Sequence, residues 1–377
     1  MTANACLHVD LQAVLDNTRY ILKEIGPGTK LIPVLKGNAY GLGALQIAET
    51  LSALPLLDTF AVSQVAEGLE LRRAGFRQRI LVMSLPLPFQ LEEAVQQDLT
   101  LTLGGFHQLA PLRDLAAKLG RRIPVSLKVD TGLHRIGFDL SEAGALCDAL
   151  RRMEGALEIV GTFSHFSGDN PELSARQESL FRLFVNRLRT AGISPGLCHM
   201  GSSASVEAGQ GLGLGAVRVG RRLFLDNPVS PSGAIREAFS LRAFLTDVRD
   251  RPAGTSLGYG AGITLPEDTR IGILSMGYGD GLDPALAHAG APVLIGGFRA
   301  RLLGCCMDQS FVDLGCVPAA PGDEVTLFGE DREGRLLSAQ EVASLIGCEG
   351  VDLTSRLTPR VSRVYHAPCG ASSSSVV

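Results

Sequence analysis

Two short apolar runs, Ile123–Asp130 (IPVSLKVD) and Leu157–Ser164 (LEIVGTFS), end in polar residues. Nearly continuous apolar strands that alternate with helices are typical of a parallel sheet covered on both faces. Amphipathic stretches such as Gln64–Ala74 and Pro171–Ala191 are the expected helices. Six similar runs complete the series: Leu31–Lys36, Thr59–Ser63, Arg79–Ser84, Leu99–Leu103, Gly196–Met200 and Ala216–Gly220. Eight strand candidates predict an α/β fold, a closed (β/α)8 barrel of the TIM type.

The pattern changes after Asn227–Gly233 (NPVSPSG), whose Pro, Ser and Gly residues indicate a linker. Short runs bounded by Gly and Pro then predict a mainly β C-terminal domain. These runs are Ser240–Val248, Ile271–Met276, Ala291–Ile295, Arg299–Leu303, Gln309–Leu314 and Glu324–Phe328, with helical patterning over Ser338–Ile346. We therefore predict a barrel over residues 1–232, with roughly the first ten as candidates for pairing with the β domain, and a β domain over 233–377 with a disordered tail over 367–377.

Composition excludes several classes of protein. The 377 residues carry 35 Lys and Arg against 39 Asp and Glu, a formal net charge of −4. This balance argues against nucleic acid or an anionic membrane as the main partner. The eight cysteines form no C-x-x-C pair, which favours reduced thiols in a cytoplasmic protein. The sequence predicts no signal peptide, and no apolar run approaches the ~18 residues of a membrane span.

Polar residues suited to chemistry follow the ends of five of the barrel runs. Barrel enzymes carry their active sites at the carboxyl ends of the strands, so we expect these residues at one mouth. They are Lys36; Lys128, Asp130 and Arg135; His165; His199, Ser202 and Ser203; and Arg218. Because polar residues from five strand ends are expected at one mouth of the barrel, the sequence predicts a functional site there. No cluster has zinc-ligand spacing, so we expect no metal.

Lys36 and the glycine-rich turns each allow two interpretations. A lysine at an apolar strand end has a lowered pKa that suits a Schiff base or a general base. It can equally be a strand-end lysine whose amine reaches solvent. The turns Gly201–Ala204 and Val219–Arg221 can cradle a phosphate, or they can be ordinary turns.

The other polar residues also have structural alternatives. His165 and Arg218 can lie under a planar cofactor, where an arginine would keep a ring nitrogen unprotonated, or they can form a structural pair. Lys128 can form a salt bridge to Asp130 or to a neighbouring strand. The residues alone leave these alternatives open.

Motifs along the whole chain resemble those of the alanine racemase family, in the same order and spacing. Val34–Gly41 (VLKGNAYG) resembles the lysine motif that binds pyridoxal 5'-phosphate. Six further segments match: Lys128–Gly137 (KVDTGLHRIG), Phe163–Phe166 (FSHF), Val217–Gly220 (VRVG), Tyr259-Gly260, Gly277–Gly281 (GYGDG) and Met307–Gln309 (MDQ). Gly322–Val325 and Arg360–Tyr365 resemble the family's C-terminal strands.

The resemblance implies an isomerase that interconverts L- and D-alanine, or a somewhat larger amino acid, and supplies D-alanine for cell-wall precursors. It implies a homodimer with shared active sites. Lys36 would hold pyridoxal 5'-phosphate and move a proton on one face, while Tyr259 of the partner subunit would serve the opposite face. Racemisation needs two such bases, because one removes the α-proton and the other returns one from behind.

The resemblance also implies roles for further residues. Arg218 would face the pyridine nitrogen, His165 would orient Tyr259 through Arg218, and Arg135 would bind the phenolic oxygen. Lys128 occupies the family's carbamylated position, where the added charge would brace Arg135. The phosphate would be held by Tyr40, Ser202, Ser203 and the backbone of Gly220 and Arg221; the substrate would meet Arg135, the Met307–Asp308 backbone and, at the entrance, Tyr278.

Several positions depart from the family pattern. Ser202-Ser203 replaces the frequent Asn-Ser, and Arg221 replaces a bulky apolar residue. Pro359 stands where a tyrosine is usual, and Pro284 follows the GYGDG segment where a basic entrance residue is expected. A widened pocket could accept a larger side chain, since one methylene changes discrimination by only about 1–3 kcal/mol.

Two other functions compete with the racemase. Basic amino-acid decarboxylases share a pyridoxal-phosphate barrel with a β domain, but they require a different phosphate loop and a catalytic cysteine motif, of which Cys305-Cys306 is a weak match. A non-catalytic pyridoxal-phosphate carrier would have the barrel alone. The C-terminal domain and Tyr259 favour the racemase.

Overall fold

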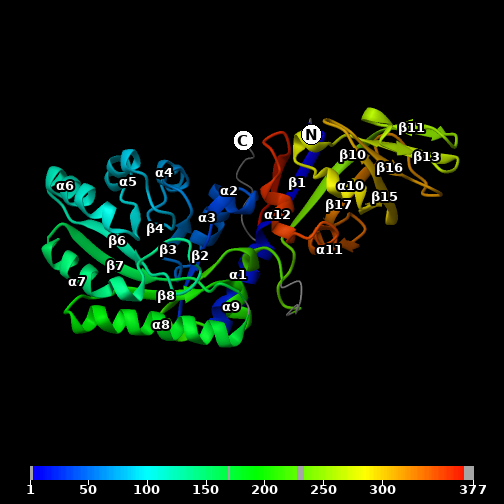
Figure 1. The fold of residues 1–377 in the computed structure, drawn as a ribbon. Helices are drawn as coiled ribbons and strands as arrows, with labels where there is room; N and C mark the ends of the chain where they lie inside the picture. Colours follow the sequence, from blue (N-terminus) through cyan, green and yellow to red (C-terminus); the bar gives the residue numbers. More distant parts are fainter. Residues whose placement is uncertain (1–2, 154, 169, 227–232, 369–377) are drawn as a thin grey trace. The chain divides into compact units, whose positions relative to one another are not determined.

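The computed structural model describes residues 3–153, 155–168, 170–226 and 233–368. They fall into two units, shown as ribbons in Figure 1. We call residues 17–39 and 44–223 the barrel unit, and residues 1–16, 40–43 and 224–377, as far as they are described, the β unit. The linker signal at 227–232 and the expected disordered tail from 369 onward lie outside the described residues.

The barrel unit contains eight parallel strands, which confirms the predicted fold class. Their hydrogen-bonded order is β2-β9-β8-β7-β6-β5-β4-β3. A bridge between Val34 and Ala61 nearly closes the sheet at its seam. The strands are β2 (Lys30–Pro33), β3 (Thr59–Val62), β4 (Arg79–Val82), β5 (Thr100–Leu103), β6 (Ile123–Lys128), β7 (Leu157–Phe163), β8 (Leu197–Gly201) and β9 (Ala216–Val219).

Burial on both faces explains why the strands are apolar at nearly every position. In β6, every residue except Pro124 is buried. Strands on both sides of the seam contribute to one core cluster, made of Ile32, Val34, Ala61, Leu81 and Ala216. A shared cluster of this kind is expected for the filled interior of a barrel.

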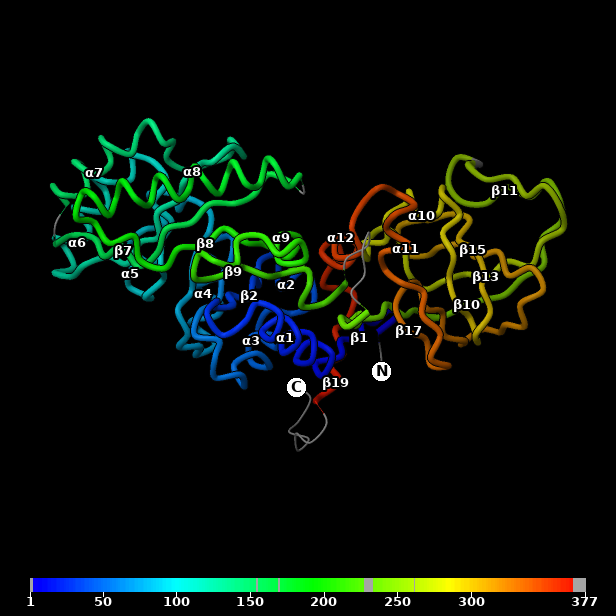
Figure 2. The backbone as a smooth tube through the Cα atoms, turned by 90° about the horizontal axis from the view of Figure 1, so that it is seen from below, coloured from blue at the N-terminus to red at the C-terminus, as the bar shows by residue number. Residues whose placement is uncertain are grey.

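Helices follow the strands and cover the barrel. Both views show α8 lying alongside β7 and β8 (Figures 1 and 2). The helices are α1 (Leu11–Ile25), α2 (Lys36–Tyr40), α3 (Ala44–Ser52), α4 (Val65–Arg73), α5 (Leu91–Gln96), α6 (Leu109–Leu119), α7 (Ala143–Arg152), α8 (Pro171–Thr190) and α9 (Ser203–Glu207).

The β unit is built on a nine-stranded, mainly antiparallel sheet, as predicted for the C-terminal part. The strand order is β18-β17-β14-β15-β16-β13-β10-β1-β19. Its first strand, β1 (Ala5–Asp10), pairs antiparallel with β10 (Phe239–Arg251) and parallel with β19 (Ser362–His366). The other strands are β13 (Thr269–Leu274), β14 (Pro292–Ile295), β15 (Phe298–Cys305), β16 (Ser310–Asp313), β17 (Glu324–Glu330) and β18 (Leu336–Leu337).

A short hairpin and three helices complete the β unit. The hairpin strands are β11 (Ser256–Leu257) and β12 (Ile263–Thr264), and Figure 2 shows the hairpin at the margin of the sheet. Leu257 and Leu265 anchor it against Ile271 of β13. The helices are α10 (Pro284–His288), α11 (Ala339–Ser344) and α12 (Gly350–Ser355).

Candidate functional site

The backbone becomes left-handed directly after Lys36. Residues 37–40 have φ angles between 51° and 61°. Left-handed conformation costs about 1–2 kcal/mol per non-glycine residue, and strain of this kind clusters at functional sites. The predicted position of Lys36 at a strand end was wrong, because β2 ends at Pro33 and the left-handed turn leaves the Lys36 side chain exposed.

A carboxylate that the sequence analysis did not single out holds this turn. Glu67 in α4 accepts hydrogen bonds from the backbone N–H of Gly37 at 2.6 Å, Ser63 at 2.7 Å and Gln64 at 2.9 Å. One side chain thus joins the turn after Lys36 to the start of α4. The Gln64-x-x-Glu67 pattern is a capping box, which predicts a helix start but not a contact with a distant loop.

Arg218 is the centre of a buried polar cluster. Its guanidinium donates to Nδ1 of His165 at 3.1 Å and to the carbonyls of Ser164 at 2.8 Å and Met200 at 3.2 Å. It also donates to Nδ1 of His199, for which the sequence analysis proposed no role. Because a guanidinium has no acceptor, both Nδ1 atoms accept, and the Nε2 atoms of the neutral rings carry the hydrogens.

Positive charge accumulates around this cluster. Burial, followed by the charges of Arg218 and Lys128, lowers the pKa of His165 to about 3, and Arg135 and Lys36 add to the effect. Burial and then Arg135 lower the pKa of Arg218 to about 9, so it stays protonated at neutral pH. A concentration of cations with neutral imidazoles is suited to binding an anion.

Lys128 does not form the salt bridge to Asp130 that was one alternative. Within the described residues, its Nζ donates to the carbonyl of Val129 at 2.9 Å, while Asp130 accepts from the backbone N–H of Gly132 at 2.9 Å and His134 at 3.1 Å. Burial, followed by the charge of Arg218, lowers the pKa of Lys128 to about 7. Much of its amine is therefore unprotonated, and nucleophilic, near neutral pH.

The two predicted phosphate turns meet at Ser203. Its Oγ accepts from the backbone N–H of Gly220 at 3.3 Å and of Arg222 at 3.4 Å. The side chain of Arg221 is instead paired with Glu207, at 2.9 and 3.0 Å. The Arg221 side chain therefore serves this ion pair, and the resemblance assigns only its backbone to the phosphate.

Tyr259 lies between the two strands of the β11–β12 hairpin and is 75 % exposed. It is flanked by Gly258 and Gly260, with φ of 74° and 67°. Positive φ at both neighbours explains why small residues surround this tyrosine. The hairpin presents its large aromatic side chain to the outside of this chain.

Tyr278, Met307 and Asp308, three further predicted residues of the β unit, belong to one connected group. Tyr278 N donates to the Cys306 carbonyl at 3.0 Å, next to Met307. Arg360 pairs with Asp308 at 2.8 Å and with Asp280 at 3.0 Å. In the sequence, Arg360 stood out only as the start of the C-terminal segment Arg360–Tyr365. The structure shows that its ion pairs connect the Met307–Asp308 turn to the GYGDG segment.

The two units divide the predicted site residues between them. The barrel unit holds Lys36, Lys128, Arg135, His165, Ser202, Ser203, Arg218, Gly220 and Arg221. The β unit holds Tyr40, Tyr259, Tyr278, Met307 and Asp308. Within the described ranges, we find no group of three or more His, Cys, Asp or Glu side chains arranged to bind a metal ion. None of the described helices has the length and hydropathy needed to cross a membrane.

Comparisons with known proteins cover both units. Residues 9–228 match the family model for the alanine racemase N-terminal domain, and residues 238–365 match the model for the alanine racemase C-terminal domain. The chain is 35 % identical over 368 residues to the alanine racemase of Desulforamulus reducens, covering 95 % of this chain and 97 % of that protein. It is also 35 % identical to the alanine racemase of Beutenbergia cavernae, over 97 % of this chain and 98 % of that one.

Solved structures agree with the sequence matches. The alanine racemase from D-cycloserine-producing Streptomyces lavendulae superimposes with a TM-score of 0.89 at 30 % identity, covering 97 % of this chain and 98 % of the other. The biosynthetic alanine racemase from Pseudomonas aeruginosa superimposes with a TM-score of 0.84 at 32 % identity, covering 97 % and 100 %. With both domain models matched and the strand order of a parallel barrel followed by a β domain, the chain belongs to the alanine racemase family.

Proposed function

We propose that the protein is a pyridoxal-phosphate-dependent racemase that interconverts L- and D-alanine by a two-base mechanism. The observation that carries the proposal is the exposed Lys36, held in a strained turn of the same unit that contains the Arg218–His165 cluster. Membership of the alanine racemase family favours this function over the decarboxylase and the carrier.

The residues of the barrel unit fit this cofactor. Lys36, Arg135 and Arg218 all act on His165 as nearby positive charges, so the region can balance a phosphate and a phenolate oxygen. The backbone N–H groups of Gly220 and Arg222, which converge on Ser203 Oγ, would hold phosphate oxygens together with that hydroxyl. Pyridoxal 5'-phosphate, when bound, supplies the electron sink that acidifies the α-proton of an amino acid.

Lys36 would hold the cofactor and move the α-proton on one face through its Nζ. Arg218 would face the pyridine nitrogen. Because a guanidinium can only donate hydrogen bonds, the pyridine nitrogen would stay unprotonated and the cofactor would be a weak electron sink. A weak sink favours return of the proton over side reactions. Lys128, whose amine is partly unprotonated, would add carbon dioxide and release a proton to form a carbamate, whose negative charge would brace Arg135.

The second base would be Tyr259 of the partner subunit. A large aromatic side chain that is 75 % exposed at a hairpin supports insertion into another copy of the chain. We therefore propose a homodimer with shared active sites. His165 and Arg218 would orient this tyrosine, while Arg135, Tyr278 and the Met307–Asp308 turn would receive the substrate. The cysteines described in the structure are all free thiols, in keeping with a proposed cytoplasmic location.

The function is tested by proton exchange at the α-carbon. The protein loaded with pyridoxal 5'-phosphate is incubated in D2O with L-Ala, L-Ser, L-Lys and L-Arg in separate reactions. NMR follows loss of the α-proton, and a chiral assay follows the D-enantiomer. We expect exchange with formation of D-alanine, fastest for alanine. Release of carbon dioxide without D-product would instead identify a decarboxylase.

Replacing Glu67 should disturb the site without touching the reactants. Glu67→Ala leaves three backbone N–H groups without their charged acceptor, so we expect a loss of at least about 2 kcal/mol in the free energy of unfolding. We also expect weaker retention of the cofactor, because the turn after Lys36 loses its anchor. Urea unfolding and cofactor titration by absorbance measure the two effects.

Glu70→Ala is the matched control for Glu67→Ala, because Glu70 is an exposed residue of the same helix. Glu70→Ala should change the free energy of unfolding and the affinity for the cofactor only slightly. Equal cofactor affinity in Glu67→Ala and the wild type would show that the turn is held by other contacts.

A further inference from the structure

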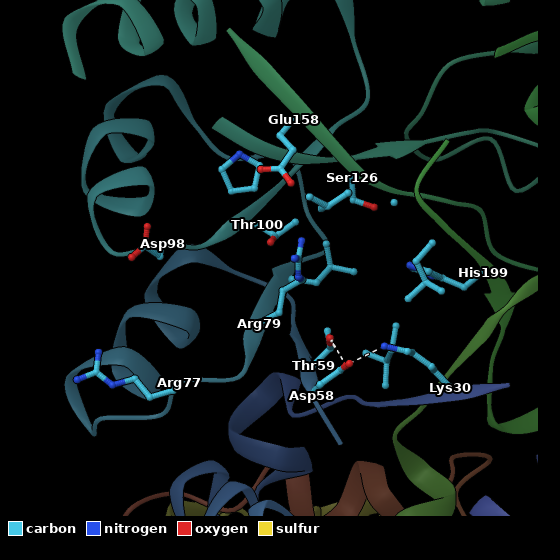
Figure 3. A pocket seen from close by; sticks show the side chains of 16 residues that line it. Lys30, Asp58, Thr59, Arg77, Arg79, Asp98, Thr100, Ser126, Glu158 and His199 are labelled. Carbon is cyan, nitrogen blue, oxygen red and sulfur yellow. Dashed lines mark hydrogen bonds and ion pairs between the residues drawn. The ribbon is translucent and has the colours of Figure 1, made fainter. Parts of the chain in front are cut away.

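A cavity of about 630 Å³ lies at the end of the barrel where the strands begin (Figure 3). Its rim includes Lys30 at the start of β2, Arg79 at the start of β4 and Glu158 near the start of β7. The site described above follows the opposite, carboxyl ends of the strands. A volume of this size is typical of small-molecule sites, which span about 300–1,000 Å³.

The floor of this cavity contains a buried hydroxyl without a partner. Ser126 Oγ makes no hydrogen bond to any described residue, although the side chain is only 2 % exposed. A Cβ added to Gly161 would lie 3.0 Å from this Oγ and 3.9 Å from Nε2 of His199, so both polar atoms lie near the Gly161 backbone, which also lines the cavity. Since Nδ1 of His199 accepts from Arg218, Nε2 carries a hydrogen. The floor therefore offers an N–H donor and a hydroxyl, and buried polar groups normally have partners.

The rim offers one cation and one anion to a ligand. Lys30 is already paired with Asp58 at 2.5 Å. Arg79 acts on Asp58 as a nearby positive charge, but among the described residues neither Arg79 nor Glu158 has an ion-pair partner within 4 Å. Figure 3 shows both side chains pointing toward the middle of the cavity. Arg77 points away from it in the same view. A simple anion would be repelled by Glu158 and a simple cation by Arg79, so the rim suits a zwitterion.

We propose that this cavity is a second binding site, which takes a free α-amino acid with a short polar side chain. Arg79 would pair with the α-carboxylate and Glu158 with the α-ammonium group. The side chain would lie against apolar lining residues such as Ile32 and Leu81 and point toward Ser126 and His199, which line the same cavity.

The strand register fits a ligand of this length. Leu81, two residues after Arg79, is paired with Thr100, and Thr102 is paired with Ser126. Arg79 and Ser126 are therefore offset by about four residues, or about 13 Å, along the strand direction, and they lie two strands apart across the sheet, which adds about 10 Å sideways. An arginine side chain and a short amino-acid side chain can span this distance together.

The second site is connected to the first through one imidazole. A ligand acceptor on Nε2 of His199 makes Nδ1 a better acceptor for Arg218. Because Arg218 would face the pyridine nitrogen, occupancy of the cavity should shift the visible absorbance of the bound cofactor. This last effect rests on the proposed function, whereas binding itself does not.

Titration calorimetry on the full-length, cofactor-loaded protein tests the proposal, with L-asparagine as the probe. Arg79→Gln and Glu158→Gln should each weaken binding about tenfold or more, because each removes one charge-assisted contact. Arg77→Gln removes the same charge from the same rim and should leave the affinity within about twofold. Propionamide lacks both the α-carboxylate and the α-ammonium group, so it should bind neither the wild type nor the variants. Equal affinity of Arg79→Gln and the wild type, or no binding of L-asparagine by the wild type, would overturn the proposal.

Two further variants separate the cavity from the cofactor site. Ser126→Ala should weaken L-asparagine binding but should not lower the unfolding temperature without ligand, since it deletes an unpaired buried hydroxyl. Lys36→Ala should retain calorimetric binding of L-asparagine even if it loses the cofactor. Loss of binding in Lys36→Ala but not in Arg79→Gln would place L-asparagine in the cofactor site and reject the second site.

Discussion

Lys36→Ala should abolish both covalent attachment of pyridoxal 5'-phosphate and racemisation. Lys36 is the residue that the left-handed turn and Glu67 hold in place. Its loss removes the amine that binds the cofactor and one of the two bases, so the rate should fall by at least about 10³-fold. Absorbance of the protein-bound cofactor measures attachment, and the D2O assay measures turnover.

Lys118→Ala provides the control for Lys36→Ala, because Lys118 is an exposed lysine of α6 that pairs with Glu92. It should bind and racemise like the wild type. If Lys36→Ala kept the absorbance of the lysine-bound cofactor, another lysine would have to hold it, and the left-handed turn would need a different explanation.

Tyr259→Phe should retain the cofactor and lose most of the racemisation. The substitution removes only the phenolic hydroxyl from an exposed side chain, so the fold is preserved. General acid–base groups contribute about 10²–10⁴-fold, and we expect a loss in that range. Because each base serves one face, exchange of the α-proton should be lost more for one enantiomer than for the other. NMR in D2O with L- and D-alanine resolves the two.

Tyr365→Phe makes the same change in β19 of the same unit, and it should leave both rates unaltered. Wild-type rates for both enantiomers in Tyr259→Phe would remove this tyrosine from the mechanism. A mixture of Lys36→Ala and Tyr259→Phe chains tests the dimer, because mixed dimers would contain one intact site. Recovery of activity on mixing is expected if Tyr259 serves the partner subunit.

Local sequence patterns predicted the elements of this protein well because burial leaves a clear signal. A strand covered on both faces, such as β6, must be apolar along its length, and eight such runs imply a barrel. The bounds were less well predicted. The run Leu31–Lys36 continues past the end of β2 at Pro33, because apolar composition does not show where a backbone becomes left-handed.

Contacts between segments that are distant in the sequence could not be predicted from local sequence patterns. Glu67 looks like a helix cap in the sequence, yet one of its carboxylate oxygens accepts a hydrogen bond from the N–H of Gly37, which is 30 residues away. His199 was recognised only as a polar residue after a strand, and its hydrogen bond to Arg218 depends on β8 and β9 being neighbours. The charge of Arg218, which helps to lower the pKa of Lys128, likewise comes from another strand, β9.

The sequence by itself determined the fold class, the two-part organisation, the resemblance to alanine racemases and the residue types at the ends of the strands. Those features depend on periodicity, spacing and residue identity, which are local properties of the chain. Only the tertiary structure decided the left-handed turn after Lys36, its anchor Glu67, the partners of Arg218 and the cavity between Arg79 and Ser126. These depend on which side chains meet when the sheet closes, because hydrogen bonds and electrostatic interactions act over a few ångströms regardless of separation along the chain.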